Sequence, residues 1–343
     1  MMARYGVGSR CCRCVFASKY KVMNELSKGS ASRLTIDEET AGQRIDNFLL
    51  RILKGVPKSH VYRILRSGEV RINSGRAAPD ARLATGDVVR VPPVRLADGP
   101  PQRPAPSDRV ASRLPVLFED EHLLVVNKPA GIAVHGGSGI VQGVIESLRV
   151  ARPQARFLEL VHRLDRDTSG VLLLAKKRAA LVDLHAQIRD GTVDKRYLVL
   201  VRGKWRDDMR RVQLALHRFT TKDGERRVRV DPGQGQAAAT VFRRVATWPR
   251  REVPLALLEA ELLTGRTHQI RVHLAHVGYP VAGDEKYGDY AWNRALVHEG
   301  LRRMFLHARR LAFVHPATAA PVAFEAPLPD ELATFIATLG ASS

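Results

Sequence analysis

The chain has 343 residues, of which 45% are hydrophobic and 26% charged, so it can bury a substantial core and form about two domains. Its 55 lysines and arginines exceed its 35 aspartates and glutamates, which gives a net charge of +20 at pH 7. An excess of this size predicts a nucleic acid as the main partner, with an anionic membrane surface as the alternative. The sequence contains no run of about 18 apolar residues, which excludes a membrane-spanning helix.

Residues 1–40 show no strong periodicity and are predicted to be a disordered leader. They hold all three cysteines, with no fourth ligand nearby for structural zinc and too few thiols for a disulfide framework: Cys11, Cys12 and Cys14. A basic stretch with several serines is compatible with a transit peptide, whereas a start at Met23 would remove the cysteines. We favour a disordered tail or the later start, and hence a reducing cytoplasm.

Residues 41–92 are predicted to form a small domain of two helices and two strands. Apolar residues at helical spacing mark the two helices, of which the second stops at Gly68: Ile45, Phe48, Leu49 and Ile52, then Val61, Ile64 and Leu65. Val70–Ile72 and Val88–Val91 have the composition of short strands. Several prolines follow, and because proline fixes the backbone and lacks an N–H, residues 93–112 are predicted to be a linker.

Residues 113–340 are predicted to form one large α+β domain, because strands and helices follow one another without regular alternation. The predicted strands are Leu123–Val126, Val171–Leu174, Tyr197–Val201, Ala239–Phe242, Leu255–Leu262 and Phe305–Phe313. Helices are predicted near residues 178–190 and over residues 332–339, with Gly340 ending the second.

Basic residues are dense in the small domain. The helices carry Arg44, Arg51, Lys54, Lys58, Arg63 and Arg66, and Arg71, Arg76 and Arg82 follow. The residues predicted to bind RNA are Arg44, Lys58, Arg63, Arg66, Arg71 and Arg76. One basic helix would indicate only a solvated face, but two of them in a chain of charge +20 favour nucleic-acid binding.

The stretch His162–Gly170 carries the most informative chemical pattern. Asp165 lies between Arg163 and Arg166, and a polar turn then leads into the apolar run Val171–Leu174. Guanidinium groups beside a carboxylate favour its charged form, which suits a nucleophile or base better than an acid. From these residues alone, an ion pair in a surface turn is the favoured alternative.

This stretch resembles the signature of the large-subunit ribosomal RNA pseudouridine synthases. Further segments in the same order extend the resemblance over residues 114–335: Asn127–Gly131, Lys195–Leu198 and Gly265–His273. Ahead of them, Arg44–Pro92 resembles the S4 RNA-binding domain. The resemblance implies an α+β catalytic fold around a mixed central sheet, preceded by a small S4-type α/β domain that recognises structured RNA by shape and phosphates.

The implied reaction isomerises a flipped-out uridine, whose base leaves the sugar, rotates and rejoins through carbon 5. On the family pattern, Asp165 either attacks the nucleotide covalently or removes a sugar proton. Tyr197 stacks on the base and offers a hydroxyl for proton exchange at carbon 5, while Arg271 pairs with the aspartate through a bidentate guanidinium. The residues expected to bind substrate are Arg163, which fills the space left by the base, and Arg166, Arg266 and His268. Without the resemblance, Tyr197 would be a core aromatic and Arg271 a surface helix residue.

No cofactor or metal ion is expected, because the product is an isomer. His268, His273 and His276 could be metal ligands, but the neighbouring Arg266 and Arg271 would repel a cation. The expected partner is 23S ribosomal RNA or a large-subunit assembly particle, bound by a cytoplasmic monomer without a membrane. The alternatives are a catalytically inert S4-bearing ribosome-assembly protein and a glycosidase, which would need a second carboxylate such as Asp167.

Two segments also resemble one branch of the family: Val134–Gly139, in which glycine and not proline follows the histidine, and Gly143–Glu146. This resemblance implies a small set of uridines in 23S ribosomal RNA as substrates.

Overall fold

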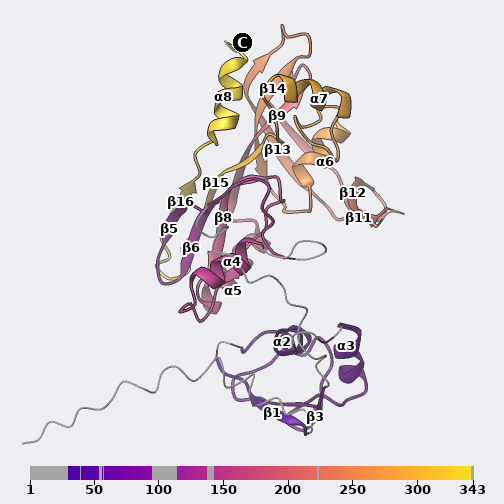
Figure 1. The fold of residues 1–343 in the computed structure, drawn as a ribbon, viewed down its shortest axis with the longest axis vertical. Coiled ribbons are helices and arrows are strands. Elements are labelled where there is room, and N and C mark those ends of the chain that lie inside the picture. Colours follow the sequence, from indigo (N-terminus) through magenta and orange to yellow (C-terminus); the bar gives the residue numbers. More distant parts are fainter. Residues whose placement is uncertain are drawn as a thin grey trace, which may run out of the picture. The chain divides into compact units, whose positions relative to one another are not determined.

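The computed structural model describes residues 30–94 except 39, 54, 55 and 57, together with residues 114–136, 143–221 and 224–340. Four parts of the predictions lie outside the described residues: the leader up to residue 29, most of the linker, the end of the motif at Val134–Gly139 and the side chain of Lys58. The chain divides into two compact units, with the boundary between residues 105 and 106 (Figure 1). They are called the N-terminal unit and the C-terminal unit below.

The N-terminal unit pairs two helices with a four-stranded sheet. Its described elements are β1 (Ser32–Thr35), α2 (Ile45–Ile52), α3 (Lys58–Arg66), β2 (Arg71–Ile72), β3 (Gly75–Arg76) and β4 (Val88–Val91), and the sheet order is β1-β4-β2-β3. The apolar helix positions are buried in one core with Val89 and Val91 of the sheet. Both predicted helices are therefore confirmed. The spacing of their apolar residues gives each helix one apolar stripe, and this stripe is buried against the sheet.

Strand β1 corrects the predicted extent of the leader. Ser32–Thr35 pair with Val88–Val91 in an antiparallel ladder, so ordered structure begins before residue 41. Leu34 and Ile36 are buried, whereas Arg33 and Thr35 are exposed. A strand of four residues is too short to show periodicity, and its position depends on a partner far along the chain.

The C-terminal unit is built on a mixed sheet, as predicted. Within the described residues the sheet has ten strands: β5 (Val116–Glu119), β6 (Leu123–Lys128), β7 (Glu159–Leu160), β8 (Ser169–Ala175), β9 (Asp194–Arg202), β10 (Met209–Gln213), β13 (Ala239–Trp248), β14 (Leu255–Leu262), β15 (Leu306–Val314) and β16 (Pro321–Glu325). Eight of them follow the order β10-β13-β14-β9-β15-β8-β6-β5, while β16 also pairs with β15 and β7 with β8. β15 and β8 run parallel, and the neighbouring pairs β15–β9 and β6–β8 are antiparallel.

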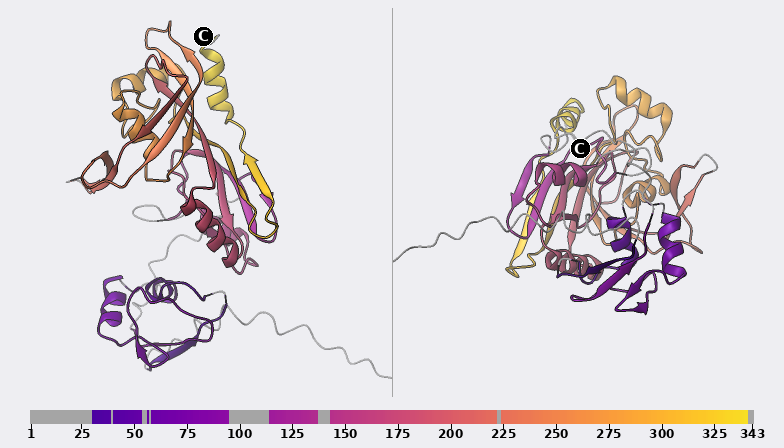
Figure 2. Two further views of the ribbon diagram at one scale, coloured as in Figure 1. Left: turned by 180° about the vertical axis from the view of Figure 1, so that it is seen from behind. Right: turned by 60° about the horizontal axis from the view of Figure 1, so that its bottom comes forward.

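A separate hairpin of β11 (Leu216–Thr220) and β12 (Arg226–Val230) projects from this unit, as both side views show (Figures 1 and 2). Its core-facing residues Leu216 and Val228 pack with Val272 of the helix α6 (Gln269–His276). The hairpin is therefore attached to the element that also carries Arg271.

Helices pack against the sheet through several hydrophobic clusters. The helices α4 (Val144–Ala151) and α6 share one cluster with alternate residues of β6, β8, β9 and β14. The intervening residues of β6 and β8 pack with α5 (Arg178–Asp190), and a third cluster joins β14 to α7 (Tyr290–His298) and α8 (Asp330–Thr338). Successive side chains of β8 point to opposite faces of the sheet, and each face is covered by one of the first two clusters. β8 is therefore buried along its whole length, which explains its unbroken apolar run.

Candidate active site

The segment that carries Asp165 connects β7 to β8 and is fixed at its end by a close approach of two strands. Gly170 in β8 lies opposite Ala308 in the parallel strand β15. A Cβ atom at Gly170 would lie 2.1 Å from the carbonyl oxygen of Ala308, and its φ of +114° is unfavourable for other residues. The glycine at the end of the motif is therefore required by the backbone of the neighbouring strand.

Two basic side chains, the buried Lys128 and the half-buried Arg303, hold the same segment. Lys128, which has 0% exposure, donates hydrogen bonds from Nζ to the carbonyl oxygens of Pro129, Ile132 and Arg166 at 2.9, 2.9 and 3.1 Å. Arg303 donates from Nη2 to the Ser169 hydroxyl at 2.9 Å and to the carbonyl oxygen of residue 167 at 3.3 Å. Burial lowers the pKa of Lys128 to about 7. These contacts fix the backbone that follows Asp165.

The Asp165 carboxylate meets Arg271, which comes from α6. Nη1 of Arg271 donates to Oδ2 of Asp165 at 3.2 Å, although the two residues are 106 positions apart. Arg271 is 7% exposed and the Asp165 side chain 18% exposed, so the pair lies at the border between core and solvent. The carboxylate thus keeps an accessible edge that a substrate could reach.

A third residue, Asp284, takes the bidentate role that the sequence assigned to Asp165. Its carboxylate, which is 1% exposed, accepts bonds of 2.7 Å each from Nε and Nη2 of Arg271. The expectation of a bidentate contact between Arg271 and Asp165 is therefore wrong, since the Nε–Nη2 edge of the guanidinium faces Asp284 and only Nη1 donates to Asp165. Burial alone would lower the pKa of Arg271, but the hydrogen bonds and charge of Asp284 outweigh it and raise that pKa. Asp284 holds the guanidinium through Nε and Nη2, and Nη1 donates to Asp165.

Tyr197 on β9 is buried and faces the same pocket. Burial and the charge of Asp165 both raise the pKa of Tyr197, so the side chain is a neutral phenol at pH 7. A neutral phenol can stack on a base or donate a hydrogen bond, but it is a poor base for removing a proton.

His268 connects the pocket to the β11–β12 hairpin. Its Nδ1 lies 2.7 Å from the hydroxyl of Tyr287, which also accepts a hydrogen bond from the backbone N–H of Val228 in β12. Its Nε2 lies 3.8 Å from Oδ1 of Asp165. Burial lowers the pKa of His268, so the ring is neutral at pH 7 and its contact with Asp165 is not an ion pair there.

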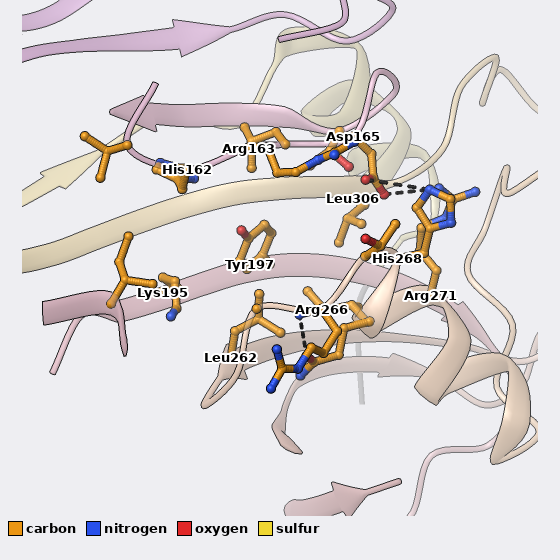
Figure 3. Close-up of a pocket in the computed structure, with 18 residues that line it drawn as sticks. His162, Arg163, Asp165, Lys195, Tyr197, Leu262, Arg266, His268, Arg271 and Leu306 are labelled. Carbon is orange, nitrogen blue, oxygen red and sulfur yellow. Dashed lines mark hydrogen bonds and ion pairs between the residues drawn. The ribbon is translucent and has the colours of Figure 1, made fainter. Parts of the chain in front are cut away.

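Asp165, Tyr197, His268 and Arg271 line one pocket of about 280 Å³ (Figure 3). That volume is close to the lower limit of about 300 Å³ for small-molecule sites, which is room for one nucleoside-sized group. Of the predicted residues, the structure brings together Arg163, Asp165, Tyr197, Arg266, His268 and Arg271. Arg166 is not among the lining residues, because its guanidinium pairs with Asp167 at 3.0 Å. Its predicted contact with substrate stays a prediction.

Sequence reasoning missed Asp284, Tyr287 and Arg303. Asp284 is an acid between two glycines, Gly283 and Gly288, a pattern that indicates a tight turn near a charged site. It could have been found as a partner for Arg271, because a buried arginine needs an acid. Tyr287 and Arg303 act through contacts between distant segments, for which the sequence carries no local signal.

The predicted RNA-binding residues lie in the N-terminal unit. Arg63, Arg66, Arg71 and Arg76 are exposed, and each also makes a contact inside the unit. Arg44 is bonded to the buried Asp46 at 2.7 Å, which commits much of its guanidinium. Their contact with RNA stays a prediction.

No group of three His, Cys, Asp or Glu side chains within the described ranges is arranged to hold a metal ion. Of the histidines that could have been ligands, His273 is buried and bonded to the hydroxyl of Thr240 at 3.0 Å. In the same part of the chain, no helix has the length and apolar character needed to cross a membrane.

Two segments of the chain match known families: residues 122–276 match the RNA pseudouridylate synthases, and residues 43–89 match the S4 domain. The ribosomal large subunit pseudouridine synthase C of Haemophilus influenzae is 48% identical over 324 residues, which cover 93% of this chain and 98% of that protein. The chain belongs to the RNA pseudouridylate synthase family.

Other comparisons agree with this family membership. The protein of the same name from Yersinia pestis is 53% identical over 301 residues, covering 87% of this chain and 92% of that protein. Among solved structures, human RNA pseudouridylate synthase domain containing 4 matches with a TM-score of 0.54 and 26% identity, over 68% of this chain and 95% of that chain. The predicted family, branch, fold and S4 domain are confirmed. RNA is therefore the partner of this pseudouridylate synthase.

Proposed function

We propose that this chain converts specific uridines of 23S ribosomal RNA to pseudouridine. The observation that carries the proposal is the Asp165 carboxylate, the only acid among the described residues that line the pocket, held 3.2 Å from Arg271. The similarity to two proteins named ribosomal large subunit pseudouridine synthase C, over nearly their whole length, supports the substrate class.

The reaction moves one bond from nitrogen to carbon. The bond between C1′ and N1 breaks with its electron pair staying on the base, while Asp165 either attacks C1′ or removes the proton from C2′. The base then turns and C5 bonds to C1′. If Asp165 attacked C1′, the bond between Asp165 and C1′ breaks in this step and releases the carboxylate; if Asp165 removed the C2′ proton, that proton returns to C2′. The proton then leaves C5, and N1 gains a proton. Atoms and electrons balance without an oxidant, and the target nucleotide must first leave the RNA stack to reach the pocket.

The other residues position these steps. Arg271, itself held by Asp284, fixes the orientation of the Asp165 carboxylate. Tyr197 offers a flat apolar ring for stacking, and its hydroxyl stays protonated. Arg163 fills the space that the flipped base leaves in the RNA. Arg166, Arg266 and His268 contact the nucleotide or its neighbours.

Two domains bind the RNA: the small domain of residues 41–92, through its basic side chains, and the catalytic domain of residues 113–340. Arg63, Arg66, Arg71 and Arg76, with Arg44 and Lys58, contact phosphates of folded RNA. We infer a monomer that acts in the cytoplasm on 23S RNA or on a large-subunit assembly particle.

Purified protein and an unmodified 23S transcript test the proposal. The wild type should introduce pseudouridine at a few positions, and Asp165→Asn should bind the transcript without converting it. Asp167→Asn is the matched control, because Asp167 pairs with Arg166 outside the pocket and should leave turnover near that of the wild type. Normal conversion by Asp165→Asn would show that the site is assigned wrongly.

The same experiment addresses the alternative of a catalytically inert S4-bearing assembly protein. Such a protein would bind the transcript and leave every uridine unchanged. A glycosidase is disfavoured by the pocket, because the second carboxylate that this class uses is absent from its described lining.

A further inference from the structure

Lys195 is a nearly buried lysine at the pocket, and its ammonium group has no partner among the residues that the structure describes. The residue belongs to β9, is 8% exposed and lines the same pocket as Asp165 and Tyr197. No hydrogen bond or ion pair joins its Nζ to another of the described residues, and no dashed line reaches it in Figure 3. A lysine this buried is normally paired.

Another buried lysine, Lys128, shows how this protein satisfies a buried ammonium group, since its Nζ donates to three carbonyl oxygens. For Lys195, burial lowers the pKa, and the charge of Asp194 offsets only part of that effect. Asp194 precedes it on β9, where side chains alternate between faces, and its carboxylate is bonded to Arg196 and Arg310. Among the described residues, the fold therefore offers the Lys195 ammonium group no acceptor, and this group faces the pocket.

The missing acceptor does not come from the pocket itself. Figure 3 shows Lys195 and His162 at one end, Asp165 and Arg271 at the other, and Tyr197 between them. Burial lowers the pKa of His162 to about 4, so this ring is neutral, and its Nε2 already accepts a bond from the backbone N–H of residue 173. Asp165 is the only acid among the described lining residues. A ligand in the pocket can therefore supply the acceptor.

Position on the strand indicates which part of the ligand it is. Lys195 and Tyr197 lie two residues apart on one face of β9, which corresponds to about 7 Å along a strand. If a uracil ring stacks on Tyr197, an ammonium group that donates to an oxygen on the edge of that ring lies at about this distance from the centre of the ring. An oxygen on the edge of the uracil is thus the matching acceptor.

We propose that the Lys195 ammonium donates a hydrogen bond to a carbonyl oxygen of the target uracil and stabilises the negative charge that forms on the base. This inference rests on the proposed function. When the bond between C1′ and N1 breaks, its electron pair stays on the base and is shared among N1, O2 and O4, whether Asp165 attacks C1′ or removes the C2′ proton. Because the charge appears only as the bond breaks, the contact strengthens in the transition state and acts on kcat.

Lys195→Met separates this role from a structural one. Methionine has nearly the same length and needs no partner, so the variant should be at least as stable as the wild type, because an unpaired buried cation is unfavourable. Its kcat should fall about 10- to 100-fold, the range expected for one hydrogen bond to a charged group, with RNA affinity unchanged within about twofold. Lys177→Met, which removes the same charge from an exposed ion pair with Glu121, is the control and should keep wild-type kcat.

Sulfur substitution in the substrate gives a second, independent readout. Short RNAs carrying 2-thiouridine or 4-thiouridine at the target position replace one acceptor oxygen by a weaker acceptor. One of the two should slow the wild type, and the same substitution should slow Lys195→Met much less, because the donor is already gone.

Each outcome decides between the possibilities. Wild-type kcat in Lys195→Met, equal sulfur effects in both proteins, or a loss of stability together with activity would each overturn the role of Lys195 while leaving the proposed function intact. If the wild type itself forms no pseudouridine in the same transcript, the proposed function fails, and the inference fails with it.

Discussion

Replacing Asp284 by asparagine keeps the size of the side chain and removes the charge that holds Arg271. Arg271 would remain 7% exposed, with Asp165 as its single carboxylate partner at 3.2 Å. Of the two bonds of 2.7 Å that Asp284 accepts, an asparagine oxygen can keep one, and its amide group would face the guanidinium unfavourably.

The magnitude follows from this loss. Removing one partner of a buried ion pair costs about 3–5 kcal/mol, and because one hydrogen bond and the contact with Asp165 remain, we expect about 3 kcal/mol. For a domain of this size, that corresponds to a decrease of about 6–12 °C in the melting temperature. Turnover should fall by about 100-fold, because a displaced Arg271 no longer orients Asp165.

Tryptophan fluorescence during urea unfolding measures the stability of the relevant unit alone. All three tryptophans belong to the C-terminal unit and are buried: Trp205, Trp248 and Trp292. The denaturation midpoint therefore reports that unit without a contribution from the N-terminal one.

Glu121→Gln provides the control, since Glu121 is 83% exposed and pairs with Lys177 on the surface. Its loss should change stability by less than about 1 kcal/mol. If Asp284→Asn unfolds at the wild-type midpoint and turns over at the wild-type rate, the reasoning about the buried carboxylate is refuted.

Three further predictions concern the scaffold and RNA binding. Gly170→Ala should destabilise the C-terminal unit by about 2 kcal/mol or more in the same urea assay, because its Cβ would lie 2.1 Å from the carbonyl oxygen of Ala308; a wild-type midpoint would contradict this. Stability should fall as the pH drops from about 6.5 to 4, because the buried His273 and His307, each with a pKa of about 4, stay neutral in the folded chain but bind protons in the unfolded chain. Each histidine lowers the free energy of unfolding by at most about 3 kcal/mol over this range. Equal denaturation midpoints at pH 7 and pH 5 would exclude this effect. Affinity for the 23S transcript should weaken by about 10³- to 10⁵-fold between 50 and 200 mM salt if about 6–10 phosphates are contacted, whereas an affinity independent of salt would contradict the role given to the basic residues.

The elements that could be predicted from the sequence are those with a local pattern. Helices α2 and α5 show apolar residues at helical spacing, and β8 and β14 show long apolar runs. The strands that escaped prediction are short or polar. In β12, with the sequence Arg-Arg-Val-Arg-Val, the position is set by pairing with β11 and by the bond from Val228 to Tyr287 and not by an apolar pattern.

The site was predictable to a similar extent. The sequence around Asp165 suggested a carboxylate among arginines, yet neither Arg163 nor Arg166 bonds it in the structure, and the contact comes from Arg271. That pairing followed from the family resemblance, because no local pattern links residues 106 positions apart. Asp284 and Lys195 were not assigned roles, since their importance depends on burial, which becomes visible only once the sheet and α6 are in place.

The most direct measurement is a pseudouridine map of 23S ribosomal RNA from the source organism with this gene deleted and then restored. Deletion should remove pseudouridine from a few positions, and those positions should return with the wild type and with Asp167→Asn but stay unmodified with Asp165→Asn. An unchanged map after deletion, or full restoration by Asp165→Asn, would contradict a reaction that depends on the carboxylate held by Arg271.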